Sequence, residues 1–415
     1  MSNSFARFAY ALVLPAMRED LAWNYTQAGA LNTANAIGYL IGAVATRMVI
    51  RRCGNRALFI GGVLATALAV LATGLTRDLG WLGFWRLASG VTGAAAFIAG
   101  GALSGNVVPA RPHLGAVTIA IYFGGGGIGF LLCGVSLPLL LDAAGAAAWP
   151  RAWVWMGVAG LAMFGASAWA ATAIAEPNQA PEGPGSGASG LAGLGAGVFA
   201  YLMFGLGYIG YMTFVIAWMR DHGASTAAVV AVWLTFGIAS LAGPWAWGVP
   251  LRRWVPARVL AAALGVLAAG AVLPLVGSGI AVMLASALLF GGAMWNIPGS
   301  VTSLAKRARP KHAWGATVAA FTIVFAAGQI AGPVATGFIA DRFGGLAIGL
   351  GLSVAVLAVG ALAALAQRDV VHRDDAGREV PNRGDTGREV PNRGNTGRAA
   401  LNRGNTGRGG PTSPG

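Results

Sequence analysis

Two arginines lie inside apolar stretches of this chain: Arg7, in ARFAYALVLPAM, and Arg86, in FWRLASG. A charged side chain costs a few kcal/mol or more at the middle of a bilayer, so a charge retained within a membrane segment indicates a functional role. A guanidinium offers a planar fork of N–H donors that matches a carboxylate or a phosphate. We therefore interpret Arg7 and Arg86 as candidates for binding an anion.

Each arginine also has a structural interpretation. Arg86 could bond to backbone carbonyls or helix ends within its own group of helices, and we regard this role and ligand binding as equally open. Arg7 could instead anchor the flank of its segment at the membrane surface if Met1 begins the natural chain.

The acidic residues also bear on the ligand. All fourteen Asp and Glu fall at the ends of apolar segments, in the polar stretches between them or in the C-terminal region. Binding a cation or carrying a proton generally uses a carboxylate inside the membrane. The pattern favours an anionic or zwitterionic ligand and leaves weak candidates for carrying a coupling proton, all at segment ends: Glu19, Asp20, Asp142 and Asp341.

Polar and aromatic side chains surround the two arginines in sequence. A stripe of small and polar residues at three- and four-residue spacing comprises Ala28, Asn32, Asn35, Tyr39 and Gly42. An asparagine in such a segment could orient a ligand, but a hydrogen bond between helices is at least as good an explanation, and the tyrosines could simply pack. The expected substrate-binding residues are Arg7, Tyr10, Asn35, Arg86, Tyr208, Tyr211 and Asn296.

The composition indicates that membrane helices position these residues. Of the 415 residues, 56% are hydrophobic and only 10% are charged, whereas soluble domains contain about 25% charged residues. Continuous apolar runs of about the 20 residues that a spanning helix needs recur along the chain, and the alternation of a membrane barrel is absent. We predict an all-α membrane protein with twelve transmembrane helices in two six-helix bundles.

The first of the twelve segments is short. From Ser4 to Met17 a helix extends about 21 Å at 1.5 Å per residue, whereas the hydrocarbon core is about 30 Å thick. The corresponding segment of the second half, at about 190–219, is long enough to span. We expect the first helix to be truncated at its start, with a short, tilted or re-entrant segment as the alternative.

The chain contains an internal repeat on either side of EPNQAPEGPGSGASG. LPAMREDL (14–21) matches IAWMRDHG (216–223), and LLLDAAG (139–145) matches GFIADRFGG (337–345). Parallel repeats build a pathway between two bundles in many membrane carriers, although chance similarity of apolar sequence is the alternative. We expect bundles at 1–175 and 191–367, joined by a cytoplasmic linker at 176–190. Arginine recurs every five residues in 368–415, without an apolar face, which predicts a disordered tail.

Basic residues predict the orientation. They cluster in the expected even-numbered loops, whereas each odd-numbered loop has at most one, beside an acid. This pattern places both termini in the cytoplasm of a bacterial inner membrane. The net charge of +14 does not indicate a nucleic-acid partner, because nine of the 28 basic residues lie in the tail and most of the others in loops.

Six plus six helices with an internal repeat and a cytoplasmic linker resemble the major facilitator superfamily (MFS). Three stretches, ARFAYALVLPAM, TQAGALNTANAIGYLIGA and FWRLASGVTGAAAFI, are similar to the YbfB/YjiJ group of that superfamily, and the resemblance covers residues 1–367. It implies that helices 1, 4, 7 and 10 line a central cavity, so that Arg7 and Arg86 would belong to cavity helices. Thr46 stands where the superfamily's loop signature has an aspartate.

These features predict a secondary active transporter that moves a small organic anion by alternating access, driven by a gradient. The alternatives are efflux of uncharged or hydrophobic compounds, with structural arginines, and a non-transporting membrane receptor or scaffold. We expect no enzymatic activity, cofactor or metal, because GLGYIG (205–210) lacks the strand that precedes a dinucleotide site and the histidines lie outside the apolar segments. We expect a monomer whose partners are lipid, a small-molecule substrate and, as a further candidate, a coupling proton.

Overall fold

The computed structural model describes residues 1–107, 115–176 and 191–370, and within these ranges the chain forms helices and no strand. The N-terminal half contains α1 (Ser2–Arg7), α2 (Tyr10–Asp20), α3 (Tyr25–Thr73), α4 (Leu79–Gly105), α5 (Gly115–Ala144), the short η2 (Ala146–Ala148) and α6 (Trp149–Ala173). The C-terminal half contains α7 (Gly195–Asp221), α8 (Thr226–Ala246), α9 (Gly248–Arg253), α10 (Pro256–Val276), α11 (Ile280–Met294), α12 (Asn296–Ala308), η4 (Lys311–Ala313), α13 (Trp314–Phe343) and α14 (Leu346–Leu365).

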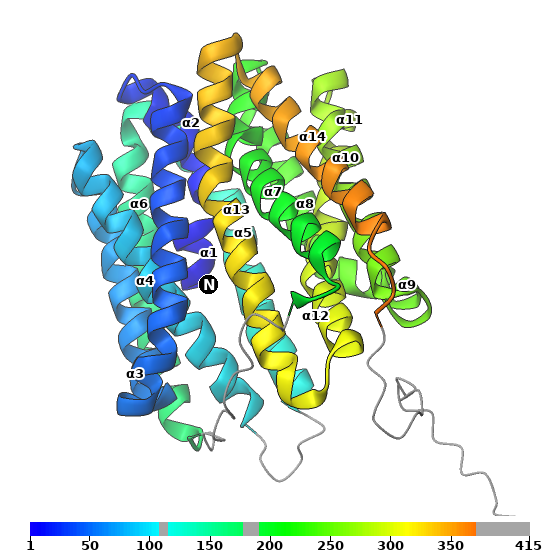
Figure 1. Ribbon diagram of the computed structural model, residues 1–415. Coiled ribbons are helices and arrows are strands. Elements are labelled where there is room, and N and C mark those ends of the chain that lie inside the picture. Colours follow the sequence, from blue (N-terminus) through cyan, green and yellow to red (C-terminus); the bar gives the residue numbers. More distant parts are fainter. Residues whose placement is uncertain (108–114, 177–190, 371–415) are drawn as a thin grey trace, which may run out of the picture. The chain divides into compact units, whose positions relative to one another are not determined.

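Ten helical stretches in the described ranges are long and apolar enough to cross a membrane. The all-helical membrane fold is therefore confirmed. The two expected segments outside these ten are the short first one and the first part of α3, so the count of twelve and the division into two bundles stay predictions. All described helices belong to one compact unit, and they run side by side (Figure 1).

The linker and the tail of the sequence analysis lie almost entirely outside the described residues. Glu176, the first linker residue, accepts hydrogen bonds from the backbone N–H of Asn55 at 3.1 Å and of Arg56 at 2.7 Å. These two residues follow Gly54, whose φ of +77° interrupts α3, and such a backbone conformation favours glycine. Asp369, in the expected tail, is paired with Arg307 at 2.9 Å.

Helices α3 and α4 pack with their backbones close together. A Cβ atom added to Gly38 would lie 2.0 Å from the carbonyl oxygen of Leu87, and one added to Gly90 would lie 2.2 Å from that of Asn35. Small residues permit this approach in membrane helices, where close van der Waals packing drives association. The contact fixes the register of α4 on α3, and thereby the position of Arg86.

The two halves contact each other through α3 with α13, α5 with α8, and α2 with α7. Asp341, near the end of α13, accepts hydrogen bonds from the backbone N–H groups of Tyr25 (2.9 Å) and Thr26 (2.8 Å) and from the Thr26 hydroxyl (2.6 Å). These donors lie in the first turn of α3, where backbone N–H groups have no partner within the helix and a negative charge is favoured. Asp341 therefore caps a helix of the opposite half.

Asp142, in the N-terminal half, makes a corresponding contact with the C-terminal half. It lies near the end of α5 and accepts a 2.5 Å hydrogen bond from the hydroxyl of Thr226, the first residue of α8. Asp142 and Asp341 are the matched aspartates of LLLDAAG and GFIADRFGG. Each of these two aspartates thus accepts a hydrogen bond from a threonine at the start of a helix in the opposite half.

A third polar contact lies beside these two. Asp221, at the end of α7, lies 3.8 Å from Arg18 and accepts a 2.6 Å hydrogen bond from the Tyr25 hydroxyl. We call the end of the helices that carries Asp142, Asp221 and Asp341 the Asp341 end. No hydrogen bond between described residues joins the halves at the opposite end, where Glu176 and Leu191 lie.

Replacing Asp341 with Asn should loosen the first turn of α3. The substitution removes the charge and part of the accepting capacity while it keeps the size, and the loss of such a cap costs about 1 kcal/mol. We expect hydrogen exchange at the amides of Tyr25 and Thr26 to become roughly fivefold faster.

The matched control is Asp78→Asn, because Asp78 caps α4 within its own half by accepting from the N–H of Trp81. It should speed exchange at the start of α4 and leave α3 unchanged. Unchanged exchange at Tyr25 and Thr26 in the Asp341 variant would contradict the capping role.

Candidate functional site

The first two helices are separated by a break next to Arg7. Helix α1 ends at Arg7 and α2 begins at Tyr10, while the N–H groups of Phe8 and Ala9 both bond to the carbonyl of Ser4. The carbonyl of Ala6 accepts a hydrogen bond from the guanidinium of Arg86. A side chain that inserts into the hydrogen-bond ladder of a helix is a recognised cause of such an interruption.

Arg86 is fully buried in the N-terminal half. Besides Ala6, its guanidinium contacts Asn32, with 3.4 Å from Nη2 to Oδ1, and lies 5.0 Å and 5.2 Å from the ring centres of Tyr10 and Trp153. Its Nε is enclosed without a hydrogen-bond partner among the described residues. Carbonyl, amide and ring contacts thus hold the charge of Arg86 inside the helix packing.

Asn32 extends this contact to the other half. Its Nδ2 donates a 2.7 Å hydrogen bond to the hydroxyl of Thr213 on α7, and this hydroxyl donates to the carbonyl of Ile209 at 2.6 Å. Arg86, Asn32 and Thr213 therefore form a hydrogen-bonded chain between the halves, and Arg86 holds the Asn32 side chain that makes the crossing.

Arg7 has a different environment. Its side chain is 8% exposed, and its guanidinium carbon lies 4.5 Å from the ring centre of Tyr39 and 6.0 Å from that of Phe8. Within the described part of the chain it makes no hydrogen bond or ion pair. Its N–H donors are therefore available to a bound molecule.

A small pocket lies at Arg7, between the two halves. Its lining consists of Arg7, Phe8, Ala11 and Asn32 from the N-terminal half and Ile209, Met212 and Thr213 from α7. The pocket thus brings the available guanidinium together with the Asn32–Thr213 bond that crosses between the halves. No carboxylate is part of this lining.

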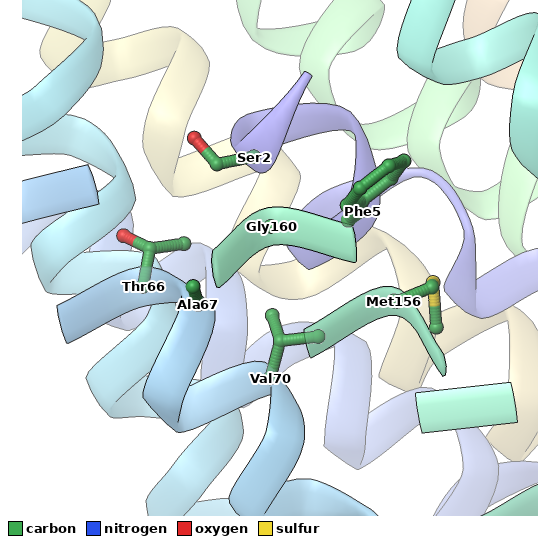
Figure 2. Close-up of a pocket in the computed structure, with 7 residues that line it drawn as sticks. All are labelled: Ser2, Phe5, Thr66, Ala67, Val70, Met156 and Gly160. Carbon is green, nitrogen blue, oxygen red and sulfur yellow. The ribbon is translucent and has the colours of Figure 1, made fainter. Parts of the chain in front are cut away.

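A second small pocket lies within the N-terminal half, between α1, α3 and α6. Figure 2 shows its lining, which is Ser2, Phe5, Thr66, Ala67, Val70, Met156 and Gly160. It contains no charged side chain and does not reach the C-terminal half, so it offers no partner for an ionic ligand.

Two of the other expected site residues serve the packing of the N-terminal half. Tyr10 is buried, and its hydroxyl donates a 2.6 Å hydrogen bond to the carbonyl of Ala28. Asn35 is buried and donates from Nδ2 to the carbonyl of Arg86 at 3.0 Å and to the hydroxyl of Ser89 at 3.1 Å. Asn35 therefore makes the interhelical hydrogen bonds that the sequence left open as the alternative.

The remaining three expected residues bond within the C-terminal half. Tyr208 accepts a hydrogen bond from Gln329, Tyr211 is bonded to Ser286 at 2.5 Å, and Asn296 donates to the carbonyl of Gly292 at 2.9 Å. None of them lines the pocket at Arg7. Among these seven residues, Arg7 alone combines a place in that pocket with available donors in the described structure.

Asn32 and Tyr39 lie near Arg7 but were not among the substrate-binding residues expected from the sequence, although the polar stripe could have indicated them. Both belong to the same stripe as Asn35. Thr213 and Phe8 gave no signal, because a threonine or a phenylalanine in an apolar helix is ordinary.

Replacing Arg86 with Met should destabilise the fold, because it leaves the carbonyl of Ala6 without its donor and Asn32 without its contact. Removing a hydrogen bond to a charged group costs about 2 kcal/mol. We expect the apparent unfolding temperature of the purified protein to fall by several degrees.

Arg7→Met is the matched control, since it removes the same side chain from a position without hydrogen bonds. It should leave the unfolding temperature near that of the wild type. An Arg86→Met protein as stable as the wild type would contradict the structural role of Arg86.

Comparison with known proteins gives the family. The model of the family described as "Uncharacterised MFS-type transporter YbfB" matches residues 2–365. No curated protein matches the chain.

Several solved structures share its fold. A bacterial homologue of the human lysosomal transporter Spinster, in an inward-facing and unoccupied conformation, is 15% identical with a TM-score of 0.68, and the match covers 89% of this chain and 95% of that one. The nucleoside transporter NupG is 12% identical with a TM-score of 0.69, over 88% of this chain and 96% of that one. At these identities the likeness shows the fold alone. Because the family model covers nearly all of the described helices, this chain belongs to the family of YbfB-like MFS-type transporters and is a membrane transporter rather than an enzyme.

Proposed function

We propose that this transporter is a secondary active carrier that moves a small organic anion by alternating access, with Arg7 as the binding cation. The observation that carries the proposal is the guanidinium of Arg7, which is 8% exposed, lies in a pocket between the halves and has no hydrogen-bond or ion-pair partner among the described residues.

Electrostatics favours an anion at this position. Removing a charge from water costs several kcal/mol, and the cost is offset only by well-placed partners. Among the described residues, Arg86 has a carbonyl, an amide and two rings around it, whereas Arg7 has only the rings of Tyr39 and Phe8. Ring contacts of this kind contribute about 1–2 kcal/mol. A bound carboxylate or phosphate would complete the environment of Arg7, and a cation would be repelled.

The contacts between the halves support alternating access. They close the Asp341 end by hydrogen bonds that Asp341, Asp142 and Asp221 accept. Clustered basic residues lie at the opposite end, as with Arg252 and Arg253, and the positive-inside rule assigns such an end to the cytoplasm. In this proposal the molecule sits in a bacterial inner membrane with both termini in the cytoplasm, works as a monomer, and is closed to the outside in this conformation.

The pocket also suggests how binding couples to movement. Asn32 and Thr213 line the pocket and bond to each other across the halves. An anion on Arg7 that also accepts from Asn32 competes with this bond. Binding would thereby weaken one of the contacts that hold the halves in the present arrangement.

The apolar side chains of Phe8, Ala11, Ile209 and Met212 in the same lining favour a second candidate. This is efflux of uncharged or hydrophobic compounds, in which Arg7 would be an incidental neighbour of the cargo. The two candidates differ in whether transport depends on the charge of Arg7.

Transport by protein reconstituted in lipid vesicles distinguishes them. A panel of labelled small carboxylates and uncharged compounds of similar size is offered to the wild type and to Arg7→Gln and Arg7→Lys. We expect Arg7→Gln to reduce carboxylate transport at least tenfold, because the anion loses its charge partner in a poorly solvated site. Arg7→Lys should retain part of the activity, because it keeps the charge without the planar fork.

Arg151→Gln is the control for removal of a positive charge. Arg151 is exposed at the start of α6, and its replacement should not alter transport. Carboxylate transport that is undiminished in Arg7→Gln would overturn the proposal, and Arg7-independent transport of the uncharged compounds would support the second candidate.

A further inference from the structure

A second helix is interrupted at the level of the pocket. Helix α11 ends at Met294 and α12 begins at Asn296, with Trp295 between them. Pro298 follows closely, and a proline lacks the N–H that would bond the carbonyl four residues earlier and crowds that carbonyl. The carbonyl in question belongs to Met294, so the sequence explains why the interruption falls at Trp295.

The interruptions in the two halves meet through their aromatic side chains. The ring of Trp295 lies 6.3 Å from the ring of Phe8 in an edge-to-face arrangement of 79°, and Phe8 lies 6.0 Å from the guanidinium carbon of Arg7. The three side chains form a row that begins in the N-terminal half and ends in the C-terminal half. Trp295 is 48% exposed. Its ring contacts Phe8 of the opposite half, and Phe8 lines the pocket at Arg7.

The ring surfaces in this row have unused capacity for contact. Phe8 is partly exposed, although its ring also lies 5.9 Å from that of Phe130, and the indole N–H of Trp295 donates to no group in the described part of the chain. The stacked rings of Tyr201, Phe204, Tyr208 and Phe325 on α7 and α13 differ, because they already pack on one another. The row at Arg7 is therefore the better candidate for holding an external ring.

We infer that the transported anion carries a planar aromatic ring, whose charged group pairs with Arg7 while its ring packs against Phe8 and Trp295. This inference rests on the proposed function and names the substrate class of the same pocket. An aliphatic anion would satisfy the guanidinium but would make no ring contact with Trp295, which is 48% exposed. A ring in offset or edge-to-face contact with Trp295 gains an interaction that an aliphatic group of equal size lacks.

Binding of four small probes to the purified protein tests the inference, with thermal stabilisation and tryptophan fluorescence as readouts. Benzoate has both the charge and the ring, cyclohexanecarboxylate has the charge and equal bulk without the ring, acetate has the charge alone, and benzyl alcohol has the ring without the charge. We expect benzoate to bind about tenfold more tightly than cyclohexanecarboxylate, and acetate and benzyl alcohol to bind more weakly still.

Two tryptophan variants test whether Trp295 causes the preference for an aromatic ring. Trp295→Leu keeps apolar bulk and should equalise benzoate and cyclohexanecarboxylate, with little change for cyclohexanecarboxylate itself. Trp245→Leu is the matched control, because Trp245 is 81% exposed on α8 and, among the described residues, its ring does not contact Phe8. It should leave the tenfold preference intact.

The outcomes distinguish a failure of this inference from a failure of the proposed function. Equal binding of benzoate and cyclohexanecarboxylate by the wild type, or a ring preference that survives Trp295→Leu, would overturn the inference and leave the anion site standing. If no carboxylate bound in a manner that Arg7→Gln abolishes, or if benzyl alcohol bound as well as benzoate, the proposed function itself would fail.

Discussion

A guanidinium charge enclosed by apolar helices is the constraint on which the rest of this structure depends. Such a charge persists only where partners offset its loss of hydration, and the chain meets this condition in two ways. Arg86 is held by the carbonyl of Ala6, by Asn32 and by two aromatic rings. Within the described ranges, Arg7 has ring contacts but no hydrogen bond or ion pair. The same residue type is thus hydrogen-bonded into the scaffold at one position and has no hydrogen-bond partner among the described residues at the other.

The two arginines also lie beside a contact between the halves. Arg86 holds Asn32, and Asn32 bonds Thr213 in the opposite half at the edge of the pocket that contains Arg7. At the Asp341 end, the halves meet through carboxylates placed on the first turns of helices. Contacts of this kind can be exchanged for water at a modest net cost, about 1 kcal/mol per hydrogen bond. They would therefore suit the surfaces that separate and rejoin in the proposed alternating access.

The backbone near the pocket is interrupted in both halves, beside Phe8 and at Trp295. Irregular backbone at membrane depth is tolerated where it is buried in protein or lines a cavity, since its free polar groups then find partners. In transporters such interruptions occur at the binding site. The meeting of the two interruptions at Arg7 is consistent with a ligand position between the halves.

The sequence by itself determined the helical membrane fold, the family and the two arginines that lie inside apolar segments. Hydropathy, loop charge and the stretches around Arg7 and Arg86 are local properties of the chain. The sequence also identified Asp142 and Asp341 as matching positions of the internal repeat. Only the tertiary structure decided their contacts. Asn32 and Asn35 share one helix stripe, and periodicity could not choose between them, since α7 packs on one and α4 on the other. The partner of Arg86 is a carbonyl 80 residues away at a helix break. A hydrogen bond depends on the atoms that packing brings within about 3 Å, and that proximity is a property of the folded chain.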